Sequence, residues 1–151
     1  MDKAAAQREK IPAMALVLGL AGIVPFAGGA IGTWANPDPI MHGFIITLVL
    51  TYGAVILSFL GGVRWGAIVN SAHHTPEIAF SVVPSLAGWI SLLMPPVIRV
   101  SVLIGGFLLQ ALWDVTGVHT GRLPDWYGRL RMGLTAIVII SLLAVLGKLV
   151  L

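Results

Sequence analysis

The sequence contains no cysteine, and only 10% of its 151 residues are Asp, Glu, Lys or Arg. The lack of cysteine excludes disulfide bonds, thiolate metal sites and cysteine nucleophiles. The low charge is unusual, because soluble domains carry about 25% charged residues. Apolar residues make up 58% of the chain, and its mean hydropathy is +0.97. A soluble fold of this size cannot hide so much apolar surface, so the composition indicates a protein that resides in lipid.

Catalytic and metal-binding patterns are also missing from the sequence. No Ser-His-Asp set, glycine-rich phosphate loop or metal-ligand spacing stands out. His73 and His74 are adjacent, and adjacent side chains point in different directions, so a metal ion shared by the two is not expected. The sequence therefore favours a protein that is not an enzyme, and it identifies no cofactor.

Five apolar stretches have the composition of membrane-crossing helices. A crossing needs about 20 mainly apolar residues, because the hydrocarbon core is about 30 Å thick and a helix rises about 1.5 Å per residue. Helices are expected because an open sheet would leave backbone polar groups bare in lipid. The third stretch is short, and we expect it to end at Pro95 and Pro96, since proline stops a helix. The sequence predicts an all-α integral membrane bundle of about five transmembrane helices in one domain, over residues 11–32, 39–69, 78–94, 97–116 and 125–150.

The basic residues predict how the bundle is oriented. They are scattered beside the apolar runs, which is typical of topology signals and not of a nucleic-acid-binding patch. With five spans, seven of them fall on the side of the N-terminus, while only Arg99 and Lys148 fall on the other side. The positive-inside rule then places the N-terminus in the cytoplasm and the C-terminus outside. The seven are Lys3, Arg8, Lys10, Arg64, Arg122, Arg129 and Arg131.

Small residues recur at four-residue spacing in the second stretch, at Ala54, Ser58, Gly62 and Gly66. Residues four apart share one helical face, so these form a shallow groove in which another helix can approach closely. We interpret the groove as a packing surface within this chain. Contact with a second copy or with another membrane protein is the alternative.

Arg64 lies inside an apolar stretch, and its placement requires an explanation. An arginine at mid-bilayer costs at least about 2.5–3.5 kcal/mol and usually pairs with an acid or faces a cavity. Asp114 is the acid expected at its depth, and Gln110 precedes Asp114 by four residues on the same face. We weigh three interpretations: snorkelling of Arg64 to the headgroups, a structural ion pair with Asp114, and contact with a ligand. The residues expected to form an electropositive rim that binds such a ligand are Arg64, Trp65, Gln110, Asp114, Trp126, Arg129 and Arg131.

Two sequence motifs resemble those of a known family. The first is YGAVILSFLGGVRWG over residues 52–66, and the second is LPDWYGRLR over residues 123–131, followed by Leu134 and Thr135. They resemble the signatures of domain-of-unknown-function (DUF) family 3429, which comprises small polytopic membrane proteins of proteobacteria and mitochondria. The resemblance covers nearly the whole chain. It implies a polytopic inner-membrane protein and brings no established activity.

Two functional hypotheses follow for this multi-pass protein, which we expect in the bacterial inner membrane. The first is a protein that binds a lipid-like, quinone-like or carboxylated small molecule, or that serves as an accessory or assembly partner of a membrane complex. The alternative is a small oligomeric transporter or channel subunit. Besides the lipid bilayer, the expected partners are a second copy of the chain or another membrane protein, and no nucleic acid.

Overall fold

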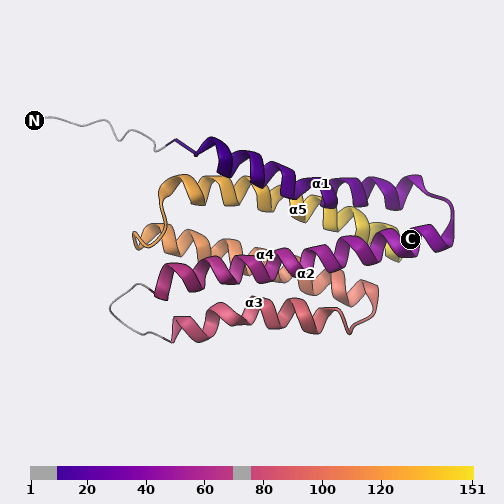
Figure 1. Cartoon of the computed structure of the whole chain (residues 1–151). Coiled ribbons are helices and arrows are strands. Elements are labelled where there is room, and N and C mark those ends of the chain that lie inside the picture. Colours follow the sequence, from indigo (N-terminus) through magenta and orange to yellow (C-terminus); the bar gives the residue numbers. More distant parts are fainter. Residues whose placement is uncertain (1–9, 70–75) are drawn as a thin grey trace, which may run out of the picture.

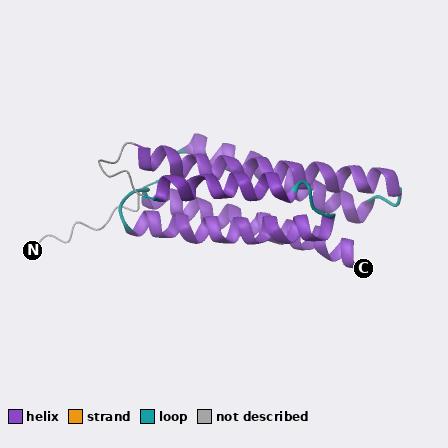
Figure 2. Cartoon of the chain, turned by 90° about the horizontal axis from the view of Figure 1, so that it is seen from below, coloured by secondary structure: helices purple, strands orange, loops and turns teal. Residues whose placement is uncertain are grey.

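The computed structural model describes residues 10–69 and 76–151, in which the chain forms five helices that run back and forth along a common axis (Figures 1 and 2). The described residues contain no strand, so the predicted all-α fold is confirmed. The first helix begins at one end of the bundle and the last helix ends at the other (Figure 1). The helices are α1 (Ala13–Ala35), α2 (Pro39–Val69), α3 (Glu77–Ser91), α4 (Pro96–His119) and α5 (Asp125–Val150).

Four of these helices, α1, α2, α4 and α5, are long and apolar enough to cross a membrane. The third helix, α3, has 15 residues and therefore spans about 22 Å at 1.5 Å per residue. It ends at Ser91, earlier than predicted, and a turn follows. Pro96 does not end α3 but opens α4, at a position where the missing N–H costs no hydrogen bond. Arg99 from α4 closes α3, because its Nε donates to the Ser91 carbonyl at 3.2 Å and its Nη2 to the Leu92 carbonyl at 2.7 Å.

The helices pack around an apolar core centred on α2 and α4. In this arrangement α3 packs against α2 and α4, while α1 packs against α2 and α5. Leu50, Leu57, Leu103 and Leu142 are fully buried at the centre. Many large apolar side chains are exposed on the outside, as expected for a bundle whose solvent is lipid.

The α2–α3 contact depends on glycine. A methyl group placed on Gly61 would lie 2.5 Å from the Ser81 carbonyl oxygen, and one placed on Gly88 would lie 2.9 Å from the Ala54 carbonyl oxygen. Neither glycine can gain a side chain unless the helix backbones separate. Small residues therefore set the distance between these two helices, as they do in many membrane bundles.

The predicted small-residue groove is only partly used for this packing. Ala54 is buried against α3, and the Ser58 carbonyl accepts a long hydrogen bond of 3.5 Å from the Ser85 hydroxyl. Gly62 and Gly66 are exposed, and a methyl group on either would meet nothing within 4 Å. The groove as predicted is therefore not one packing face within this chain. Contact of Gly62 and Gly66 with a second chain stays a prediction.

Candidate functional site

Asp114 is the centre of a buried polar cluster near the C-terminal end of α4. The residue is 0% exposed. Arg131 of α5 donates from Nε to Oδ2 at 3.0 Å, and Gln110 donates from Nε2 to Oδ1 at 3.3 Å. The same Gln110 nitrogen lies 3.4 Å from the Leu60 carbonyl of α2. The Asp114 carboxylate therefore links α4 to α5, and Gln110 links α4 to α2.

Arg64 enters this cluster from α2 but does not pair with Asp114. It is 1% exposed, and its guanidinium carbon lies 4.4 Å from the centre of the Trp113 ring. Within residues 10–69 and 76–151 no ion pair joins Arg64 to an acid, and its Nε and Nη1 atoms are buried without hydrogen-bond partners. The predicted Arg64–Asp114 ion pair is thus replaced by an Arg131–Asp114 pair. Snorkelling is wrong for Arg64 as well, because the side chain is enclosed by its neighbours.

Gly117 provides the space that the Arg64 side chain occupies. A methyl group at Gly117 would overlap the Arg64 Nη1 atom and lie 2.9 Å from a Leu123 methyl carbon. Leu123 is itself buried and follows the end of α4. The end of α4 is therefore shaped around a buried arginine.

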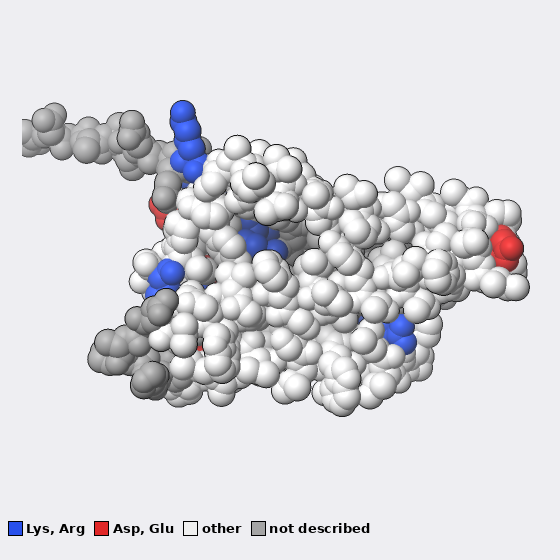
Figure 3. Space-filling model, in the orientation of Figure 1, with Lys and Arg blue, Asp and Glu red and all other residues white. Residues whose placement is uncertain are grey.

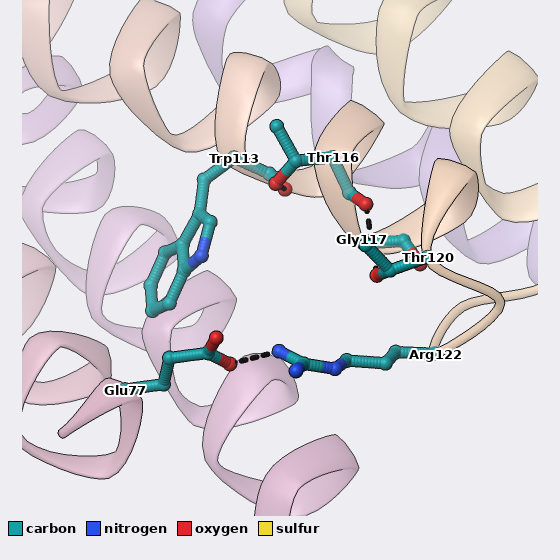
Figure 4. A network of polar contacts seen from close by, with 6 residues as sticks. All are labelled: Glu77, Trp113, Thr116, Gly117, Thr120 and Arg122. Carbon is teal, nitrogen blue, oxygen red and sulfur yellow. Dashed lines mark hydrogen bonds and ion pairs between the residues drawn. The ribbon is translucent and has the colours of Figure 1, made fainter. Parts of the chain in front are cut away.

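An ion pair at the surface connects the same end of α4 to α3 (Figure 4). Gly121 has a φ of +68°, and the Arg122 N–H donates to the Gly117 carbonyl at 2.9 Å, which closes the helix in a Schellman motif. This turn presents Arg122 to Glu77 at the start of α3, and the two side chains form an ion pair. The hydrogen bond that Arg122 donates to the Glu77 carboxylate raises the pKa of the Arg122 guanidinium above its usual value. Arg122 is therefore charged at neutral pH.

A partly open cavity of about 300 Å³ lies next to the polar cluster and is lined by residues of α1, α2, α4 and α5. Most of its wall is apolar. Figure 3 shows a hollow between α1 and α2 with Lys or Arg atoms at its floor, and Arg131 is the one arginine or lysine among the residues that line the cavity. The wall includes Gly22, Phe26, Phe107, Trp126, Leu134 and Val138.

Three polar side chains of α5 line this cavity, and each leaves a polar atom without a partner. The Tyr127 hydroxyl, Arg131 Nη2 and Thr135 Oγ1 are buried and make no hydrogen bond. The residues are four apart, so they lie along one face of the helix. A buried polar group without a partner costs about 1–3 kcal/mol, and such groups are rare enough in native proteins to need a reason. The three residues thus bring side chains with unused hydrogen-bonding capacity together beside one cavity.

The structure brings together some of the residues predicted from sequence and separates others. Arg64, Gln110, Asp114 and Arg131 form the buried cluster, and Trp126 lines the cavity. Trp65 is 45% exposed, and Arg129 is exposed on another face of α5. Neither lines the cavity.

The sequence-based prediction missed Tyr127 and Thr135 as site residues. The available signal was the spacing Tyr127, Arg131, Thr135 along one face of an otherwise apolar helix. The position of the Trp113 ring against the Arg64 guanidinium was not predicted either.

Residues of both sequence motifs lie in the buried cluster and in the cavity wall. Both motifs also fall within the match to a protein family. A model of the protein family of unknown function DUF3429 matches residues 11–147. The chain belongs to this family. The family assignment predicted from the two motifs is confirmed.

Curated relatives of this DUF3429 chain carry the name transmembrane protein 69. The protein from Xenopus tropicalis is 35% identical over 137 residues, which cover 87% of this chain and 53% of the relative. The protein from Mus musculus is 30% identical over 149 residues, which cover 89% of this chain and 56% of the relative. The chain thus spans about half the length of these relatives. No solved structure matches it.

Proposed function

We propose that this multi-pass membrane protein binds one amphipathic, lipid-like molecule in the cavity between α1, α2, α4 and α5. The observation that carries the proposal is that Tyr127, Arg131 and Thr135 line the cavity in a row and that each has a buried polar atom without a partner. A polar head group that accepts hydrogen bonds would satisfy them. The apolar remainder of the molecule would lie among the residues of α1 and α2.

The size and composition of the cavity support this occupant. A volume of about 300 Å³ lies at the lower end of the range of about 300–1,000 Å³ for small-molecule sites. The wall opposite the polar row is formed by apolar side chains such as Ile23, Ile56 and Val63. An apolar wall with a few converging polar groups is typical of a binding site and supplies no nucleophile–base pair for a reaction.

The predicted orientation would place the head group in the cytoplasmic half of a bacterial inner membrane. This location is part of the proposal, and the distribution of basic residues supports it. A cytoplasm-dependent reporter fused after Leu151 should be inactive. Activity of that reporter would reverse the orientation and place the head group on the opposite side.

Filling the cavity should abolish binding. Gly22 lines it, and a methyl group at this position would meet only the Tyr52 hydroxyl at 3.7 Å, so the backbone tolerates a larger side chain there. We expect Gly22→Leu to fold but to lose ligand-dependent stabilisation. The measurement is the melting temperature of delipidated protein in non-ionic detergent, with and without oleate, oleyl alcohol or phosphatidylglycerol.

Gly43→Leu is the matched control, because Gly43 is an exposed helical glycine with nothing within 4 Å of the added side chain. A ligand present at about 100 times its Kd stabilises a protein by about 2.7 kcal/mol. At least one of the three compounds should therefore raise the melting temperature of the wild type and of Gly43→Leu by several degrees. The proposal is contradicted if none does, or if Gly22→Leu responds as strongly as the wild type.

A further inference from the structure

The buried charges of the described chain do not balance. Its buried charged residues are two arginines, Arg64 and Arg131, and one acid, Asp114, which leaves one positive charge. The three are 1%, 7% and 0% exposed, so water screens this charge poorly. A buried charge without compensation is strongly unfavourable in a low-dielectric interior. The imbalance therefore requires an explanation beyond helix packing.

Asp114 cannot compensate both arginines with good geometry. One carboxylate oxygen accepts from Arg131 and the other accepts from Gln110. Arg64 instead lies over the Trp113 ring, which attracts a cation more weakly than a carboxylate does. The excess charge is thus shared by two arginines that face one acid.

Arg131 connects this excess charge to the cavity. Its Nε atom is held by Asp114, while the residue also lines the cavity and its Nη2 atom has no partner. Arg64 and Asp114 do not line the cavity. Any head group beside Arg131 would therefore experience a field set partly by Arg64, a residue that it does not touch.

We propose that the cavity selects head groups with a single negative charge, a carboxylate or a phosphodiester, over neutral ones, and that Arg64 is a positioning residue that sets this selectivity through the Arg131–Asp114 pair. The inference rests on the proposed function and names its ligand class. One negative charge neutralises the buried set. A neutral head group satisfies the hydrogen bonds of Tyr127 and Thr135 but leaves the charge uncompensated.

The test compares ligands that differ in head-group charge and share their apolar part. Oleate is compared with oleyl alcohol, and phosphatidylglycerol with diacylglycerol, each titrated into delipidated full-length protein by native mass spectrometry. We expect the wild type to bind the anion of at least one pair at least about tenfold more tightly than its neutral counterpart, because even partial neutralisation in a low-dielectric site exceeds the roughly 1.4 kcal/mol that corresponds to tenfold. The pair with the larger ratio identifies the source of the anion, a fatty acid or a phospholipid.

Variants of Arg64 separate its role from a general loss of stability. Arg64→Gln removes the excess charge and should reduce the anion-to-neutral ratio to within about threefold of one, while binding of the neutral compound is retained. Arg64→Lys keeps the charge and should keep most of the ratio. Arg129→Gln, on an exposed arginine of α5 outside the cavity, should leave the ratio unchanged. If Arg64→Gln does not fold, Arg64→Met, which keeps more of the side-chain volume and flexibility, provides the neutral variant.

The experiment distinguishes failure of the charge selectivity from failure of the Arg64 role and from failure of the proposed function. Equal affinity of the wild type for anion and neutral compound overturns this inference and leaves the proposed function intact. An unchanged ratio in both Arg64→Gln and Arg64→Met overturns the role of Arg64. If no compound of either pair binds, the proposed function itself fails.

Discussion

Asp114→Asn should lower the free energy of unfolding by about 3–5 kcal/mol, because it leaves two buried arginines without any buried acid. The asparagine side chain retains an acceptor for Arg131 but no charge. The measurement is equilibrium unfolding in mixed detergent micelles. Asp125→Asn is the matched control, because Asp125 is exposed in the first turn of α5 and its charge contributes only about 0.3–1 kcal/mol there.

The partner of Asp114 can be identified by a double-mutant cycle. Arg131 contacts Asp114 directly. The double variant Asp114→Asn with Arg131→Gln should therefore lose clearly less free energy of unfolding than the sum of the losses in the two single variants. A loss for Asp114→Asn no larger than that for Asp125→Asn would contradict the account of the buried cluster. Strict additivity with Arg131→Gln would contradict the ion pair.

Gly61→Leu should also destabilise the bundle strongly, by about 3 kcal/mol or more, because the new side chain must push α3 away. The atom in its path is the Ser81 carbonyl oxygen, which belongs to a helix backbone and cannot rotate aside. The adjacent Gly62 is exposed and has nothing of this chain within 4 Å, so Gly62→Leu is the matched control and should change the stability of the monomeric bundle by less than about 0.5 kcal/mol. The same unfolding assay compares the two variants. Equal tolerance of both substitutions would contradict the close α2–α3 contact.

The helices were predictable because the length of an apolar run decides whether it can cross a bilayer. The rotation of each helix about its own axis was not predictable in the same way. In a water-soluble protein an apolar stripe marks the buried face, whereas in lipid both faces are apolar and the stripe disappears. For this reason four-residue spacing identified Gly62 and Gly66 as a face of α2, but the face that packs on α3 includes Gly61.

The buried charged cluster was likewise predictable in part: the depth of its residues was, and their pairing was not. The depth of Arg64 beside Asp114 was expected from its apolar neighbourhood and from the lengths of the helices, whereas its burial was only one of the interpretations left open. Which arginine reaches Asp114 depends on the angles at which α2 and α5 meet α4, and these angles are properties of the packed bundle. Arg131 has the pairing geometry, and Arg64 instead meets Trp113.

If the cavity holds one amphipathic molecule, that molecule should be visible in the mass spectrum of the intact protein. The wild type should be extracted from membranes in a mild non-ionic detergent, without added lipid, and measured beside Gly22→Leu. We expect one retained molecule per wild-type chain, with a head group of single negative charge, and a bare chain for Gly22→Leu. A bare wild-type chain under conditions in which a control membrane protein retains its known lipid would contradict the proposed function.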